Sequence, residues 1–344
     1  MKAVLICQGF EETHALGTIV RRDGIVSGLW SHGVDAEKVI LQRRPRYLAE
    51  VLSVVRPKRT QLEKSVGASD VLVLEGLPTA VACIAALRQF YAGKIHVDIC
   101  DSWLRLESSG RGAGSSLRAF VTRRIKRLLS IVALKYVSKR TNSLSYISRL
   151  DLNTDLPTLS TKAKTFVIPN GNPFPLHPVS ECWDRSGPMV VVGDWAYPPN
   201  QEMLTSVLRW YLAIKDRPGL RIVGPNLTGL SALPNDVKVL GWLDNISDAY
   251  KGVSCALALT STGSGVKNKV LEPLSLGVPV IATTDALNGV DAEDHMVLTF
   301  RDSLDKEDVD RWLDSVLLRG TSALVAPSWE QNTSEFISYV RDGS

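Results

Sequence analysis

The sequence predicts an α/β protein built from two Rossmann-like domains. Short apolar runs alternate with longer helical patterns along the 344 residues, which is typical of βαβ units around parallel sheets. The alternation begins again after a proline-containing stretch at residues 172–188, which we interpret as an interdomain linker. A length of roughly 150 residues per domain also gives two domains.

The first half is expected to form one domain, residues 1–175. Its apolar runs predict strands at residues 4–6, 38–41, 70–74, 95–100, 144–147 and 166–168. Its helical patterns predict helices at residues 18–32, 45–55, 78–90 and 115–138. The runs are continuous rather than alternating, so the sheet is expected to be covered on both faces.

The second half is expected to form a domain of the same kind, residues 186–326. Strands are predicted at residues 189–192, 220–223, 237–240, 254–259, 279–282 and 297–300. Helices are predicted at residues 200–214, 246–251, 267–276, 305–318 and 329–340. We expect residues 327–344, with the last of these helices, to pack back on the N-terminal domain.

Composition and charge narrow the functional classes. The net charge of +4 fits an anionic small substrate or a membrane surface, and a solvated surface explains it as well. Platforms rich in aromatic residues are absent, so we expect no nucleic-acid binding. The five scattered cysteines form no C-x-x-C motif, and no ligand cluster predicts a metal site. Scattered cysteines and the lack of a long apolar run indicate a cytoplasmic protein.

Residues 259–274 are the most informative segment. They read as a strand, a glycine-rich loop and a helix, so unpaired amides at the helix start are expected to form an anion site. Lys267 and Lys269 add positive charge there, and a diphosphate is the expected ligand. Glu272 would repel a phosphate and is better explained as an acceptor for a hydroxyl group. The alternative interpretation is a glycine-rich turn followed by a solvated basic helix.

Glycines end three of the predicted strands of the second half, at Gly193, Gly224 and Gly241. Ligands of doubly wound sheets bind beyond the carboxyl ends of the strands, and glycine lets a ligand approach the backbone. In the first half, Asp101 follows a predicted strand. It either orients an acceptor hydroxyl or the donor sugar, or caps the segment that follows.

Several motifs resemble those of family 4 glycosyltransferases, which are retaining enzymes of GT-B fold. The resemblance is specific in the second half, at residues 191–200, 222–225, 239–243, 265–272 and 279–284 with 288–289. It is looser in the first half, at residues 97–102, 146–148 with Asp151, and 167–171.

The resemblance implies positions for the donor. The diphosphate is expected on the glycine-rich loop and the amides after it, which comprise Gly265, Val266, Lys267 and Asn268, with Lys269 nearby. Ser264 is at the position that touches the donor sugar in the family. Glu272 is expected to bind the ribose hydroxyls, and the base is expected near Pro225, Trp242 and Leu243. The sequence departs from the family where Ser264 replaces a second glutamate, and where residues 194–200 contain neither arginine nor lysine.

The expected activity is transfer of a sugar from a UDP-, GDP- or dTDP-sugar to a saccharide, lipid-linked or metabolite acceptor. Lys267 or Lys269 would stabilise the leaving diphosphate, so neither a metal nor another cofactor is needed. Two alternatives stay open. One is a nucleotide-sugar epimerase of the same fold, and the other is a catalytically silent nucleotide-sugar-binding subunit, which Ser264 favours.

A basic amphipathic pattern covers residues 117–140. This segment has eight Lys or Arg residues and no acidic residue. Such a helix can lie on anionic lipid, which would place the protein peripherally at the inner face of a membrane. A helix packed on the core with a solvated basic face also explains the pattern and is slightly favoured.

Overall fold

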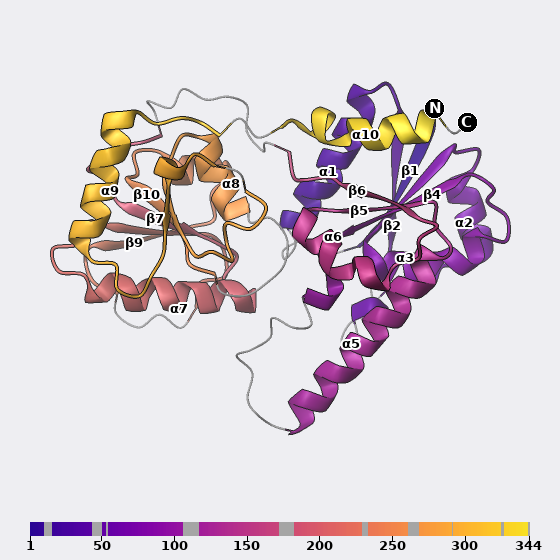
Figure 1. Cartoon of the computed structure of the whole chain (residues 1–344), viewed down its shortest axis with the longest axis horizontal. Helices are drawn as coiled ribbons and strands as arrows, with labels where there is room; N and C mark the ends of the chain where they lie inside the picture. Colours follow the sequence, from indigo (N-terminus) through magenta and orange to yellow (C-terminus); the bar gives the residue numbers. More distant parts are fainter. Residues whose placement is uncertain are drawn as a thin grey trace. The chain divides into compact units, whose positions relative to one another are not determined.

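The computed structural model describes residues 1–9, 16–42, 50–52, 54–105, 117–171, 182–228, 233–260, 268–290, 292–324 and 327–342. The chain divides into two compact units, Met1–Gly171 with Pro327–Ser344, and Asn172–Ala326 (Figure 1). Each unit is built around its own parallel sheet.

Within the described residues, the N-terminal unit has a six-stranded parallel sheet in the order β2-β1-β3-β4-β5-β6. The strands are β1 (Lys2–Gln8), β2 (Asp35–Leu41), β3 (Val71–Glu75), β4 (Lys94–Cys100), β5 (Ser143–Tyr146) and β6 (Lys164–Val167). Side chains of β1 and β3 alternate between two separate hydrophobic clusters, so both faces of this sheet are buried, as predicted.

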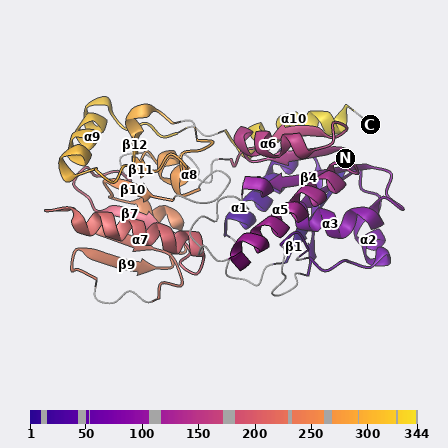
Figure 2. The same cartoon turned by 60° about the horizontal axis from the view of Figure 1, so that its bottom comes forward.

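Helices cover the two faces of this sheet (Figure 2). One face packs on α2 (Arg59–Val66), α3 (Gly76–Leu87) and α5 (Leu117–Ser138), and the other packs on α1 (Leu16–Ser31) and α10 (Trp329–Arg341). The short helix α6 (Arg149–Asp155) follows β5.

Helices α2 and α6 of the N-terminal unit were not predicted from the sequence, and one predicted helix was wrong in part. Helix α2 buries only Leu62 and Val66 of its eight residues, which is too little for a clear apolar period. In α6 two buried residues are aspartates. Of the helix expected at 45–55, residues 43–49 lie outside the described residues, and Glu50–Leu52 form only a single 3-10 turn.

The C-terminal helix α10 packs against α1 through two glycines. A Cβ atom at Gly24 would lie 1.9 Å from the Trp329 ring, and one at Gly28 would lie 2.5 Å from the Thr333 hydroxyl. Glycines four residues apart share one helix face, so the α1 backbone can approach α10 closely there. Phe336 and Ile337 complete the contact in the core.

The C-terminal unit has a second parallel sheet, with the order β12-β11-β10-β7-β8-β9 in the described part of the chain. Its strands are β7 (Met189–Val192), β8 (Leu220–Val223), β9 (Val237–Gly241), β10 (Cys255–Ala258), β11 (Val280–Ala282) and β12 (Val297–Thr299). The helices are α7 (Pro198–Ala213), α8 (Asn268–Ser275), α9 (Lys306–Arg319) and the 3-10 turns η4 (Ile246–Tyr250) and η5 (Asp294–Met296). None of the described helices is long and apolar enough to cross a membrane.

Candidate functional site

The strand order of the C-terminal sheet reverses between β7 and β10. Strands β8 and β9 extend the sheet on one side of β7, whereas β10, β11 and β12 extend it on the other. Ligands of open α/β sheets bind beyond the carboxyl ends of the strands at such a point. The loop after β7 and the start of α8, which follows β10, therefore flank the expected ligand position.

The predicted glycines come together at this edge of the sheet. Gly193 donates its amide to the Val223 carbonyl at 3.0 Å, and Gly224 donates its amide to the Gly241 carbonyl at 2.7 Å. The ends of β7, β8 and β9 thus lie side by side.

Close packing between loops accounts for two of these glycines. A Cβ atom at Gly224, whose φ is +128°, would lie 1.8 Å from the Gly193 carbonyl oxygen, and one at Gly193 would lie 3.1 Å from the Trp195 ring. The two backbones meet because Gly224 has no side chain, and Gly193 leaves room for the Trp195 ring. Approach of a donor to Gly193 and Gly224 stays a prediction.

A polar network that the sequence did not reveal joins the loops after β7 and β8. The Asp194 carboxylate accepts the Ala196 amide and the Asn226 side-chain amide, each at 3.0 Å. Asn200, in the first turn of α7, donates its side-chain amide to the Asp194 carbonyl at 2.9 Å. These contacts fix the loop of residues 194–200, where the family often has an arginine and a lysine and this sequence has neither.

Lys269 is joined to this network. Its ammonium donates to Asn200 Oδ1 at 2.6 Å and lies 3.6 Å from Met203 Sδ. Because Asn200 also bonds the Asp194 carbonyl, the start of α8 is tied to the end of β7 across the point where the strand order reverses. The Lys269 ammonium therefore lies at the place where an anionic ligand is expected to bind.

Glu272 lies one helical turn after Lys269 and is held by a buried tyrosine. The Tyr250 hydroxyl donates to Glu272 Oε2 at 2.9 Å. Burial raises the pKa of Glu272, whereas the Tyr250 hydrogen bond and the Lys269 charge lower it. Burial and the adjacent carboxylate raise the pKa of Tyr250 well above its ordinary value, so Tyr250 stays a donor.

The remaining predicted donor residues are distributed as follows. The Pro225 carbonyl accepts a hydrogen bond from the Trp195 backbone amide at 3.1 Å. Trp242 directly follows β9 and is exposed, whereas Leu243 packs on the core. Asn268 is the first residue of α8. Ser264, Gly265, Val266 and Lys267 lie outside the described residues.

In the N-terminal unit, Asp101 follows β4 at a backbone irregularity. The pairing of β4 with β5 shifts register between Asp98 and Cys100, and Cys100 has a φ of +66°. A left-handed conformation costs a non-glycine residue roughly 1–2 kcal/mol, and such outliers cluster at functional sites. The geometry thus directs the chain at Asp101 away from the strand.

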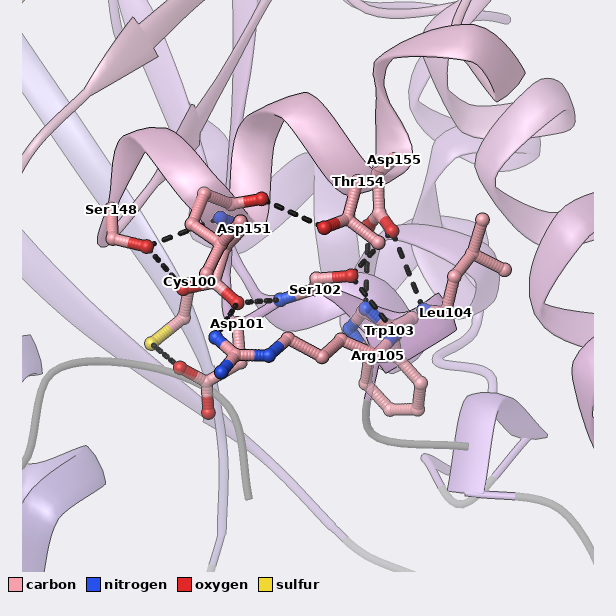
Figure 3. A network of polar contacts seen from close by, with 11 residues as sticks. Cys100, Asp101, Ser102, Trp103, Leu104, Arg105, Ser148, Asp151, Thr154 and Asp155 are labelled. Atoms are coloured by element: carbon pink, nitrogen blue, oxygen red, sulfur yellow. Dashed lines mark hydrogen bonds and ion pairs between the residues drawn. The ribbon is translucent and has the colours of Figure 1, made fainter. Parts of the chain in front are cut away.

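Two buried aspartates fix the turn after Asp101 (Figure 3). Asp155 accepts the Ser102 hydroxyl at 2.7 Å and the amides of Trp103 and Leu104 at 3.2 and 3.3 Å. Asp151 accepts the Ser102 amide at 3.2 Å.

Ser102, rather than Asp101, caps this turn. Its hydroxyl accepts the Arg105 amide at 3.0 Å, which is the bond that an N-cap residue makes. The N-cap bond of this turn therefore belongs to Ser102, and the role of Asp101 toward a substrate stays a prediction.

The N-terminal sheet has a reversal of its own, between β1 and β3. There the backbone amide of Gln8 donates to Glu75 Oε2 at 2.9 Å. Arg22 forms an ion pair with the same carboxylate at 2.9 Å. Burial raises the pKa of Glu75, and Arg22 opposes this shift. Sequence patterns gave no signal for this pair, because its two members lie 53 residues apart.

Among the described residues, no group of three or more His, Cys, Asp and Glu side chains is placed to hold a metal ion.

The two parallel-sheet units define the GT-B fold class. Sucrose-phosphate synthase from Thermosynechococcus elongatus is similar, with a TM-score of 0.62 and 12% identity over 99% of this chain and 95% of that one. HepE from Anabaena, solved in complex with UDP, gives a TM-score of 0.59 and 13% identity over 98% of this chain and 95% of that one. A UDP-N-acetylglucosamine 2-epimerase gives a TM-score of 0.51 and 13% identity over 100% of this chain and 96% of that one. At these identities the similarity establishes the fold.

The family comparison is more specific. Residues 188–312, within the C-terminal unit, match the family model of group 1 glycosyl transferases. A comparison with curated protein sequences found no match.

Proposed function

We propose that this protein is a retaining glycosyltransferase that takes a sugar from a nucleoside-diphosphate sugar and transfers it to a saccharide or lipid-linked acceptor. The observation that carries the proposal is the contact of Lys269 with Asn200 at 2.6 Å. It places a cation at the start of α8 and at the reversal point of the C-terminal sheet, which is where an anionic ligand is expected.

The chemistry needs positive charge at this place. When the bond between the anomeric carbon and the diphosphate oxygen breaks, the electron pair stays on the departing diphosphate. The acceptor oxygen bonds to the anomeric carbon, and its hydroxyl proton passes to the departing diphosphate or to water. Lys269 and the positive end of α8 stabilise the leaving group more as its charge grows, which accelerates the reaction. We assign Lys267, Gly265, Val266 and Asn268 to the same diphosphate by the family resemblance.

Glu272 is assigned to the ribose hydroxyls of the donor. The Tyr250 hydroxyl bonds one of its oxygens and so fixes the orientation of the carboxylate. A carboxylate only accepts hydrogen bonds, and two neighbouring hydroxyls can donate to it. Ionised phosphate groups have no hydrogen to donate and would be repelled. The base is assigned to the surface near Pro225, Trp242 and Leu243, and Asp101 to the orientation of the acceptor or the donor sugar.

The comparisons support a nucleotide-sugar donor. The C-terminal unit matches the group 1 glycosyl transferase model, and HepE has been solved with UDP-glucose. A UDP-sugar is therefore the first donor to test, ahead of GDP- and dTDP-sugars. We propose that neither a metal ion nor another cofactor takes part.

An epimerase is the second candidate, because a UDP-N-acetylglucosamine 2-epimerase shares the fold over the whole chain. Both candidates bind the same type of donor. They differ in whether the sugar is transferred to an acceptor or is changed while still attached to the diphosphate.

Isothermal titration calorimetry with UDP, GDP and dTDP tests the proposed donor site. We expect one nucleotide to bind, and Lys269→Ala to weaken its binding about ten-fold or more, since a hydrogen bond to a charged group contributes about 1.5–3 kcal/mol. Lys238→Ala is the matched control, because Lys238 is exposed on β9 of the same unit. Equal affinity of Lys269→Ala and the unsubstituted protein would remove Lys269 from the site, and no binding of any nucleotide would contradict the proposal.

A further inference from the structure

The outer face of α5 carries an exposed apolar stripe. Val121, Ile125, Leu128 and Val132 are all exposed, with exposed fractions of 61% for Leu128 and 56% for Val132. Their spacing of four, three and four residues places them on one face of the helix. Phe120 is also exposed and lies at one edge of this stripe, one turn before Arg124.

The opposite face of α5 packs on the core of the N-terminal unit. Ala133, Leu134 and Val137 are buried in the cluster that α3 shares. The first half of α5 extends beyond the rest of the N-terminal unit (Figure 1). Among the residues that the structure describes, no loop or neighbouring helix of this unit buries the stripe.

The charge of this segment is strongly one-sided. Residues 117–140 contain eight Lys or Arg residues and no Asp or Glu. The whole chain has 40 basic and 36 acidic residues, so the rest of it has 32 and 36 and a net charge of −4. Positive charge is concentrated on α5 and the two residues after it.

Basic side chains line one edge of the apolar stripe. Arg124, Arg127 and Lys135 are exposed, and their spacing of three and eight residues sets them beside Leu128 on the helix surface. The Arg124 guanidinium stacks on the Phe120 ring at 4.8 Å. The exposed face is thus apolar along its middle and cationic along its border.

We propose that α5 docks lengthwise on the surface of an anionic membrane. Apolar side chains would enter the boundary between headgroups and acyl chains, and the arginines and lysine would contact lipid phosphates. An anionic lipid surface matches both features at once, whereas a second copy of α5 would bring two cationic borders together. The helix of 22 residues is about 33 Å long, which spans several lipid headgroups. This surface is independent of the proposed donor site.

Flotation of the full chain with vesicles tests this proposal. Phosphatidylcholine vesicles with phosphatidylglycerol are expected to carry the protein upward at low salt, and phosphatidylcholine vesicles alone are not. Each basic side chain near the surface contributes about five-fold to binding, or ~1 kcal/mol. The double variant Arg124→Gln/Arg127→Gln is therefore expected to bind about 25-fold more weakly.

Apolar variants separate docking from simple charge attraction. Ile125→Gln/Leu128→Gln is expected to lower the partition coefficient at least ten-fold, because each side chain loses apolar burial in the lipid. Leu317→Gln/Leu318→Gln is the matched control, since these leucines of α9 are exposed by 57% and 88%. The control is expected to float like the unsubstituted protein.

Three results would overturn the proposal. One is no flotation on anionic vesicles. Another is equal flotation of the α5 variants and the unsubstituted protein. The third is a dimer in light scattering that Ile125→Gln/Leu128→Gln dissociates while flotation is unchanged, which would assign the stripe to self-association. Circular dichroism verifies that each variant is folded.

Discussion

Asn200 connects Lys269 with the loop after β7, and it illustrates what single residues contribute to this site. Its side chain accepts from the ammonium and donates to the Asp194 carbonyl. Lysine is a flexible cation, so a fixed acceptor reduces the number of positions that the ammonium can take. We interpret Asn200 as a positioning residue for Lys269.

Asn200→Ala is expected to reduce donor binding less than Lys269→Ala does, by roughly five-fold, because about 1 kcal/mol of hydrogen bonding is lost while the charge remains. Calorimetry with the bound nucleotide measures the effect. Thr205→Ala is the control, since Thr205 is exposed on α7 and bonds only the backbone of its own helix in the contacts described. An Asn200→Ala protein with unchanged affinity would show that Lys269 does not depend on this contact.

His96 allows a prediction on pH. It is buried between Ser143 and Ser145, and desolvation lowers its pKa from 6.5 to about 4. Between these values the unfolded chain binds more protons than the folded chain, so the free energy of unfolding falls as pH falls from 6.5 to 4. The loss from this residue is about 3 kcal/mol.

Denaturant unfolding of the unsubstituted protein and of His96→Gln at several pH values in this window measures that loss. The variant is expected to lose less stability on acidification, and the difference between the two curves isolates His96 from the carboxylates. Equal pH dependence in both proteins would contradict the assignment. So would a His96 ring signal that titrates near pH 6.5 in nuclear magnetic resonance spectra.

Sequence reasoning reached some of these residues and missed others for a physical reason. Lys269 and Glu272 were predicted as site residues because a strand, a glycine-rich loop and a helix follow each other locally, and the three glycines were predicted because each ends an apolar run. Asn200 and Tyr250 could not, since they meet Lys269 and Glu272 only after folding, 69 and 22 residues apart in sequence.

At the scale of elements, the contact between α1 and α10 depends on the absence of side chains. The sequence predicted a helix at residues 329–340 and we expected residues 327–344 to pack back on the N-terminal domain; in the structure α10 packs on α1. Nothing in the local pattern of α1 indicated that Gly24 and Gly28 are contact residues. Glycine inside a helix ordinarily weakens it, so its presence here has a packing explanation.

Gly24→Ala is expected to destabilise the protein by about 1–3 kcal/mol, because the added Cβ collides with the Trp329 ring. Helix propensity alone predicts the opposite sign, a gain of roughly 0.5–1 kcal/mol. Urea unfolding distinguishes the two.

The pair Gly24→Ala and Trp329→Ala forms a double-mutant cycle for this contact. In the Trp329→Ala background the same glycine substitution is expected to be neutral or stabilising, since the obstructing ring is gone. Destabilisation of equal size in both backgrounds would show that α10 does not restrict α1 at this position.

At the scale of the whole molecule, alternating patterns sufficed to predict two α/β units, and the order of strands could not be derived from them. Order depends on which strand edges form backbone hydrogen bonds with each other, and the apolar pattern of a strand does not specify its neighbour. The observed orders place a reversal between β7 and β10 in one sheet and between β1 and β3 in the other. The first of these coincides with the segment that the sequence marked as an anion site.

Transfer of a sugar is the central claim, and nuclear magnetic resonance spectroscopy of a UDP-sugar incubated with the protein and a saccharide acceptor tests it most directly. We expect UDP to accumulate together with a glycoside whose anomeric configuration equals that of the donor, and Lys269→Ala to slow both. A UDP-sugar that changes configuration while still attached to the diphosphate would contradict transfer and favour an epimerase. A donor that binds and stays intact with every acceptor tested would contradict transfer as well, and would make the protein a nucleotide-sugar-binding subunit.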